Sequence, residues 1–456
     1  MSAMSNTLIT DFTEGNITGK LYRFAFPLFL SSLLQVVYNM VDMIVVGHVM
    51  GKVGLSAVAV GGDVSNFLTF LAMGFCNAGQ VIISQYIGAG KKSDLGRFIS
   101  TMFSSLMICA IILSGVFIVL RVPVLNLMNT PPEAFSEALA YSTICISGSV
   151  FIYGYNITSA VMRGMGDSKN PFIFVALASV INIILDIIFV ACMKMGAAGA
   201  AYATVISQAI SFILCSIFIL RNREKYSMTV KFCDFLRPDL SMFISLAKLG
   251  VPMAIKSASI HFSKLFVNSW INSYGVAVSA FAGIAAKLSA VSNLISNSLN
   301  TAGSSMVGQN IGAKKFKRVP MIMKSVFFTV FGISTLMSLA ILIFPEAIFS
   351  VFTTDGAVMA VAMEYIPIAV LMFYGSAARA PMNAFLNGSG NYRINFVTAI
   401  LDGIVMRIGL SVFFGLTMKL GYSGFWLGDA LAGFTPLWIG IVFYLKGSWR
   451  KNALTK

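Results

Sequence analysis

Charged residues are scarce in this chain. Asp, Glu, Lys and Arg make up 11% of its 456 residues, whereas soluble domains carry roughly 25%. A surface with so few charges cannot face water over most of its area, so a soluble globular protein is excluded. The six cysteines have no metal-ligand or disulfide-framework spacing. Most lie in apolar runs, where cysteine packs as a small hydrophobic residue.

Motifs for catalysis and ATP binding are also missing. His48 and His261 are the only histidines, and the sequence contains no H-E-x-x-H, no G-x-S-x-G and no His/Cys cluster. A membrane enzyme is therefore disfavoured. The absence of G-x-x-x-x-G-K-[ST] argues against ATP as an energy source. The first twenty residues are polar and include Asp11 and Glu14, so we expect no cleaved signal peptide.

Long apolar segments are abundant, and 57% of the residues are hydrophobic. Roughly 20 helical residues cross a bilayer, and a helix satisfies all the backbone groups of such a segment in lipid. The sequence therefore predicts an all-α membrane protein with twelve transmembrane helices. We expect these helices near residues 22–48, 55–85, 98–120, 138–162, 171–193, 197–220, 246–272, 278–309, 322–344, 360–385, 394–417 and 423–445.

The basic residues are distributed unevenly between the predicted loops. With a cytoplasmic N-terminus, the cytoplasmic side carries 21 Lys and Arg residues and the opposite side carries four. The positive-inside rule then predicts an integral protein of the plasma (inner) membrane with both termini in the cytoplasm. Topology thus explains the net charge of +15. Membrane lipids with anionic headgroups are the expected neighbours, and we expect no nucleic acid partner.

The two halves of the sequence repeat each other at an offset of 224 residues. Gln85-Tyr-Ile-Gly-Ala matches Gln309-Asn-Ile-Gly-Ala, and Gly164-Met-Gly matches Gly388-Ser-Gly. Six spans in each repeat give both halves the same orientation, so a pseudo-two-fold axis along the membrane normal should relate them. We predict an N-terminal six-helix lobe over residues 1–220 and a C-terminal six-helix lobe over residues 244–456. The basic segment 221–243 would be a cytoplasmic linker.

Polar side chains form stripes in three spans of the first half. Asp42 ends a stripe in the first span, Asn182 and Asp186 lie one turn apart in the fifth, and Gln208 belongs to a stripe in the sixth. A charged residue inside a span costs roughly 2.5–3.5 kcal/mol. Helix–helix hydrogen bonding can explain the uncharged members, but no basic residue in their spans can pair with Asp42 or Asp186. These carboxylates could bind Na⁺ or hold protons.

The second half lacks this carboxylate pair. At the offset of 224, Asn182 falls on Met406 and Asp186 on Leu410. Ionisable residues occur elsewhere in its spans, and an internal ion pair is one interpretation of the last three. These residues are Lys256, His261, Lys264, Asp402, Arg407 and Asp429.

Five segments resemble the multidrug and toxic compound extrusion (MATE) family, and the resemblance covers essentially the whole chain. They are Pro27 to His48, Ser84 to Ala89, Arg163 to Asp167, Asn182 to Asp186, and Gly199 to Thr204. The resemblance implies a secondary antiporter that exports organic cations or drugs in exchange for Na⁺ or H⁺ by alternating access.

The resemblance also implies a set of site residues. The family's cation or proton site corresponds to Asp42, Asn182, Asp186 and Thr204, with Asp42 and Asp186 as Na⁺ ligands in a sodium-coupled protein. The family's helix-bending proline corresponds to Pro27. We expect a cationic amphiphilic substrate, a monomer, and no cofactor besides the coupling ion. Candidates for the substrate cavity are Gln35, Tyr38, Asn39, Tyr153, Asn156, Gln208, Lys256, His261 and Asn293.

A rival function stays open at this point. A lipid-linked oligosaccharide or lipid flippase of the same wider superfamily would suit the basic residues Lys256, Lys264 and Arg407 in the second half. The sequence also leaves open whether Na⁺ or H⁺ is the coupling ion.

Overall fold

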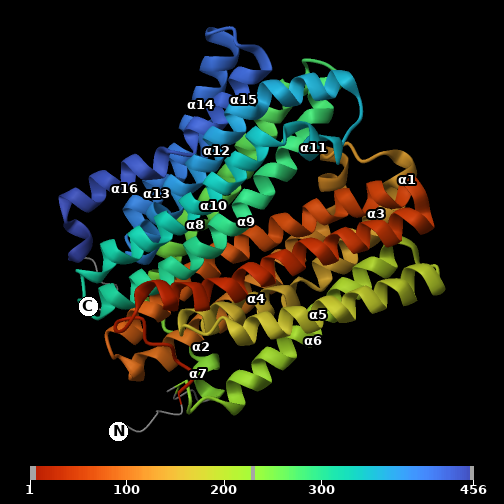
Figure 1. Ribbon diagram of the computed structural model, residues 1–456. Coiled ribbons are helices and arrows are strands. Elements are labelled where there is room, and N and C mark those ends of the chain that lie inside the picture. Colours follow the sequence, from red (N-terminus) through yellow and green to blue (C-terminus); the bar gives the residue numbers. More distant parts are fainter. Residues whose placement is uncertain (1–6, 227, 229–231, 452–456) are drawn as a thin grey trace. The chain divides into compact units, whose positions relative to one another are not determined.

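The computed structural model describes residues 7–226, 228 and 232–451, and within them it contains helices and no strand (Figure 1). The helices of the first half are α1 (Ile17–Gly88), α2 (Lys92–Leu127), α3 (Pro132–Ser147), α4 (Ser149–Gly164), α5 (Lys169–Asp186), the π-helical η1 (Ile187–Cys192), α6 (Gly196–Arg221) and α7 (Phe232–Leu236).

The second half follows the same plan. Its helices are α8 (Leu240–Asn272), α9 (Val276–Gly312), α10 (Arg318–Ile343), α11 (Pro345–Ser350), α12 (Gly356–Gly388), α13 (Tyr392–Ile400), the π-helical η2 (Leu401–Val405), α14 (Met406–Val412), the π-helical η3 (Phe413–Thr417), α15 (Gly421–Ala432), α16 (Thr435–Lys446) and the short 3₁₀ helix η4 (Ser448–Arg450).

The number of spans follows from helix length and from two breaks. Among the described residues, ten helical segments are long and apolar enough to cross a membrane, and the pair α3 and α4, bent by 46°, forms a further broken span. Helix α1 has 72 residues. At roughly 1.5 Å per residue it would be about 110 Å long, over three times the thickness of a bilayer's hydrocarbon core. It is interrupted at Gly51, whose φ of 62° and ψ of −147° are not helical, so it supplies two spans. The predicted all-α membrane fold of two six-span halves is confirmed.

The sequence repeat has a structural counterpart in the packing of two glycines. A Cβ on Gly164 would lie 2.8 Å from Ile83 and 2.9 Å from the Gln80 carbonyl oxygen. A Cβ on Gly388, 224 residues later, would lie 2.8 Å from Val307 and 2.7 Å from the Ser304 carbonyl oxygen. Because only a residue without Cβ allows such an approach, each glycine lets its helix pack directly on a neighbour's backbone.

The chain forms two compact units whose limits differ from the predicted lobes and linker. The first unit contains Phe26–Gly250 and the chain before Phe12, and the second contains Phe12–Ala25 and Val251–Lys456. Both α1 and α8 therefore pass from one unit to the other within the helix, close to Pro27 and Pro252. The predicted linker 221–243 falls within the first unit, and its residues 227 and 229–231 lie outside the described part of the chain.

Tertiary hydrogen bonds explain why Phe12–Ala25 belongs to the second unit although it lies near the start of the chain. The Phe12 backbone N–H donates to Gln309 Oε1 at 2.9 Å, and Asn310 Nδ2 donates to the Phe12 carbonyl at 3.1 Å. In the first unit, the start of α8 is held by the ion pair of Arg97 with Asp239 at 2.8 Å. Contacts of this kind join residues hundreds of positions apart, so the sequence pattern does not reveal them.

Candidate functional site

Four polar side chains from three helices of the first unit contain unpartnered buried atoms. Asp42 on α1, Asn182 and Asp186 on α5, and Gln208 on α6 each have at least one side-chain polar atom that is buried and makes no hydrogen bond with any described residue. Asp42 is 5% exposed, Asn182 1% and Asp186 0%. A buried polar atom without a partner is costly. Such a cluster therefore indicates a site for a ligand.

The carboxyl groups of Asp42 and Asp186 are neighbours. Each lies close enough to the other to interact electrostatically, and neither forms an ion pair with any described residue. Two like charges in a medium of low dielectric constant repel strongly unless a proton or a cation lies with them. Carboxylate and amide oxygens are suitable ligands for a hard cation such as Na⁺. The donor set therefore fits the predicted cation or proton.

Local helix geometry places Asp186 at a special position. It is the last residue of α5, and the six residues that follow form the π-helical turn η1. A π-helical turn within an α-helix is rare and is frequent at functional sites, because the wider turn changes the direction of the side chains that follow. The spacing of Asn182 and Asp186 by four residues keeps both side chains on one face of α5.

Two other predicted residues of the first unit, Tyr38 and Thr204, each lie one helical turn before a member of this cluster. Tyr38, half-buried and one turn before Asp42, is close enough to Asp42 and Gln208 to interact electrostatically with both. Thr204 is half-buried one turn before Gln208, and its backbone carbonyl accepts a hydrogen bond from Ser207. Its place among the cation ligands stays a prediction, as does that of Asn182.

The remaining candidates of the first unit differ in exposure. Gln35 is half-buried and Asn39 is exposed. Tyr153 is buried and its hydroxyl donates to the Leu68 carbonyl at 2.8 Å, while Asn156 donates to the Ile152 carbonyl at 2.8 Å. The backbone of α1 continues through Pro27, whose carbonyl accepts a hydrogen bond from Ser31. A role of Pro27 in bending is still a prediction.

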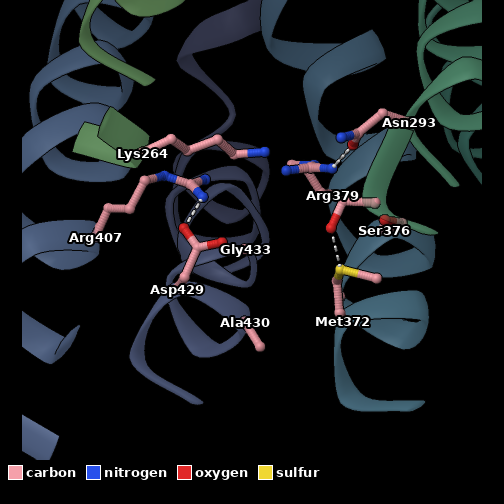
Figure 2. A pocket seen from close by; sticks show the side chains of 11 residues that line it. Lys264, Asn293, Met372, Ser376, Arg379, Arg407, Asp429, Ala430 and Gly433 are labelled. Carbon is pink, nitrogen blue, oxygen red and sulfur yellow. Dashed lines mark hydrogen bonds and ion pairs between the residues drawn. The ribbon is translucent and has the colours of Figure 1, made fainter. Parts of the chain in front are cut away.

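The second unit contains a cavity of about 170 Å³ between α8, α9, α12 and α15. Lys264, Asn293 and Asp429 line it, and they also line a smaller adjoining space together with Arg379 and Arg407 (Figure 2). The predicted candidate Asn293 therefore lines a cavity. Lys256 donates to Asn383 Oδ1 at 2.7 Å, and His261 is exposed.

The ion-pair interpretation of the last two spans is correct. Arg407, which is 2% exposed, binds the carboxylates of both Asp402 and Asp429. Arg379 on α12 was not among the residues predicted from the sequence, and its Nη2 donates to Asn293 Oδ1 at 2.7 Å. Its presence within the predicted span 360–385 was the available signal, because arginine inside a span is rare.

Comparisons with known proteins agree with this fold and with these motifs. The MatE family model matches residues 27–188 and 252–413, once in each half. The chain is 32% identical over 309 residues to the probable multidrug resistance protein YpnP of Bacillus subtilis, with 68% of each chain covered. It is 24% identical over 385 residues to the probable multidrug resistance protein NorM of Bacillus cereus, with 82% of this chain and 84% of the relative covered.

A solved structure has the same fold. The outward-facing conformation of a multidrug resistance MATE family transporter of the MOP superfamily superposes with a TM-score of 0.88 at 22% sequence identity, and all of both chains is covered. The fold and the repeated family match define a membrane transporter built from two homologous halves. The chain belongs to the MatE family, the multidrug efflux transporters that its motifs resemble.

Proposed function

We propose that this protein is a secondary active antiporter that exports organic cations and drugs in exchange for Na⁺ or H⁺ by alternating access. The observation that carries the proposal is the buried Asp42 and Asp186 pair, which has no ion-pair partner among the described residues. The names of its relatives, which are multidrug resistance proteins, support drugs as the exported compounds.

The carboxylate pair offers a physical basis for coupling. A proton or Na⁺ that neutralises the repulsion between Asp42 and Asp186 stabilises whichever conformation holds them closest. One elementary charge moving through about 100 mV is worth roughly 2.3 kcal/mol, enough to bias such an equilibrium almost fifty-fold. Asn182 and Thr204 are the proposed neutral ligands, and Pro27, which frees a backbone carbonyl in α1, makes that helix a candidate for movement.

Efflux from proteoliposomes tests the proposal. Ethidium, an organic cation, is loaded into vesicles that contain the purified protein, and a Na⁺ gradient or a pH gradient is then imposed. We expect at least one gradient to accelerate ethidium efflux relative to vesicles without a gradient. Efflux that is equal with and without both gradients would contradict coupled export.

The location and the assembly of the protein are part of the proposal. We place it in the inner membrane as a monomer among membrane lipids, with both chain ends in the cytoplasm; those ends lie outside the described residues. The distribution of Lys and Arg supports this orientation. A reporter enzyme fused to the C-terminus should be active only in the form that works in the cytoplasm, and activity of a periplasmic reporter would reverse the orientation.

A lipid-linked oligosaccharide or lipid flippase is the second candidate. The observation in its favour is the group of basic side chains around the cavity of the second unit, which would suit a phosphate headgroup. The same proteoliposomes distinguish the two functions when a fluorescent lipid replaces ethidium. Lipid translocation without ethidium efflux would favour the flippase.

A further inference from the structure

Positive side chains outnumber negative ones around the cavity of the second unit. Two residues of α8, one of α12 and one of α14 carry positive charge, and two carboxylates lie within electrostatic range of them. The four cations are Lys256, Lys264, Arg379 and Arg407, and the two carboxylates belong to Asp402 and Asp429.

Arg407 forms ion pairs with both of these carboxylates, and Lys256 forms one with Asp402. Asp402 Oδ1 lies 3.3 Å from Arg407 Nη2, and Asp402 Oδ2 lies 4.0 Å from Lys256 Nζ. Asp429 forms its ion pair with Arg407. In contrast, neither Lys264 nor Arg379 forms an ion pair with any residue that the structure describes. The positive charges of Lys264 and Arg379 beside the cavity therefore have no ion-pair partner among the described residues.

Figure 2 shows how these two side chains are arranged. The Lys264 ammonium, from α8, and the Arg379 guanidinium, from α12, point toward each other. Arg379 uses one N–H group to donate to Asn293 Oδ1 at 2.7 Å, and Lys264 makes no hydrogen bond with a described residue. Two facing cations inside a membrane protein repel, and an anionic oxygen group between them would remove the repulsion and accept their free N–H groups.

Much of the cavity wall is apolar. Val267, Ile271, Ala282, Ala285, Tyr365 and Trp426 line the cavity of about 170 Å³. Its polar lining consists of Lys264, Asn268, Ser289, Asn293 and Asp429, and the last of these is paired with Arg407. A ligand that fills this space therefore needs a compact apolar body as well as a negatively charged head. The planar fork of arginine matches the oxygen geometry of a carboxylate or a phosphate, and the lysine adds a movable point charge.

We propose that Lys264 and Arg379 form a binding site for the phosphate or carboxylate group of an amphiphile. The apolar part of this ligand lies against Val267, Tyr365 and Trp426. The site extends the substrate class from organic cations to anionic and zwitterionic amphiphiles. This consequence for transport rests on the export function proposed above, whereas binding at the site does not.

Calorimetry on the full-length protein in nanodiscs of neutral lipid tests the site, with hexyl phosphate as the probe. We expect saturable binding that is at least about tenfold weaker in Lys264→Gln and in Arg379→Gln, since each substitution removes one charge-assisted hydrogen bond worth roughly 1.5–3 kcal/mol. Lys264→Arg should keep the affinity near that of the wild type. Lys324→Gln is the matched control, because Lys324 is an exposed residue of α10 in the same unit.

Two further arms separate the sources of the anionic group. Competition by phosphatidic acid in the nanodisc would assign the site to a bilayer lipid, whereas unchanged hexyl phosphate binding in those discs would assign it to a soluble ligand. Stronger binding of hexyl phosphate than of inorganic phosphate would confirm the apolar wall. The proposal is overturned if hexyl phosphate does not bind saturably, or if Lys264→Gln and Arg379→Gln bind it as well as Lys324→Gln does.

The test also separates this site from the proposed export function. Hexyl phosphate binding is measured at equilibrium and without an ion gradient, so its outcome does not depend on coupled export. If the wild type shows no gradient-driven ethidium efflux but binds hexyl phosphate saturably, the proposed antiport is wrong and the proposed binding site is supported. Gradient-driven ethidium efflux without saturable hexyl phosphate binding would support the antiport and overturn the proposed binding site.

Discussion

Individual carboxylates in this protein differ in what surrounds them. Asp402 and Asp429 lie beside Arg407, which neutralises them, while Asp42 and Asp186 have each other as neighbours and no described ion-pair partner. An ion pair with Arg407 accounts for the negative charges of the first arrangement. The second is costly unless a proton or cation is present, and this cost is what the proposed coupling role would use.

The first prediction concerns this pair. Asp42→Asn and Asp186→Asn should each reduce gradient-driven ethidium efflux by roughly 5- to 150-fold, because an amide cannot alternate between a charged and a neutral state. Both variants should still fold, since the substitution removes a buried repulsion. Glu346→Gln, an exposed carboxylate in α11, is the control. Wild-type efflux by both Asp variants would place the coupling site elsewhere.

A second prediction at the residue scale concerns Asp239, which lies outside the spans, just before α8. Its side chain accepts hydrogen bonds from the Ser241 hydroxyl at 2.5 Å and from the Ser241 and Met242 backbone N–H groups at 2.8 and 3.2 Å. These bonds, together with the ion pair to Arg97, hold the pKa of the Asp239 carboxyl below its ordinary value. Asp239→Ala should therefore cost about 1 kcal/mol at neutral pH, the usual value of a helix N-cap.

The pH dependence of that cost has a definite sign. A carboxyl whose pKa is lowered by folding contributes stability that is fully present above its unfolded pKa, near about 3.9, and is lost as pH falls through the folded pKa. The thermal stability difference between wild type and Asp239→Ala should shrink below about pH 4. Asp239→Asn, which keeps a capping oxygen and has no charge to titrate, is the control. A difference that is constant down to pH 3 would contradict the charged cap.

At the scale of helices, the two halves resemble each other more in how their helices pack than in which polar residues the helices carry. Helices α4 and α12 both end in a glycine that packs against the backbone of another helix, α1 for Gly164 and α9 for Gly388. The polar residues differ, because Asp186, the carboxylate of α5, has no counterpart in α14. A duplicated scaffold can therefore hold a cation site in one unit and a basic cavity in the other.

The third prediction tests this shared packing. Gly164→Ala and Gly388→Ala should each destabilise the protein by roughly 1–3 kcal/mol, because the new methyl group meets backbone that cannot move aside. Gly332→Ala in α10 is the matched control. A Cβ on Gly332 meets no atom within 4 Å, so alanine should leave the stability equal or slightly higher. Thermal unfolding in detergent measures the difference, and equal stability of all three variants would contradict the role of close packing.

The sequence predicted the spans better than it predicted their assembly. Hydropathy and the repeat gave the twelve helices because each apolar run must be helical in lipid. The passage of α1 and α8 from one unit to the other near Pro27 and Pro252 was not predicted, since it depends on distant partners such as Gln309. The π-helical turn after Asp186 was also missed, because no residue type in it signals the extra residue that each hydrogen-bonded ring encloses.

For the whole molecule, antiport requires two ligands to compete through one conformational equilibrium. The coupling ion at Asp42 and Asp186 and the exported compound must each favour a different conformation. By thermodynamic linkage, the factor by which the ion weakens substrate binding equals the factor by which substrate weakens ion binding. This reciprocity distinguishes an antiporter from a channel, in which the ion needs no such effect.

Calorimetry of ethidium binding to the purified protein, repeated across Na⁺ concentrations and pH values, is the most direct test. We expect the affinity for ethidium to fall by roughly 5- to 150-fold as Na⁺ or H⁺ rises, with the responding ion identifying the coupling ion. Asp42→Asn should bind ethidium with an affinity that no longer depends on that ion. Ethidium affinity that is indifferent to both Na⁺ and H⁺ in the wild type, with Asp42 intact, would contradict the antiport mechanism.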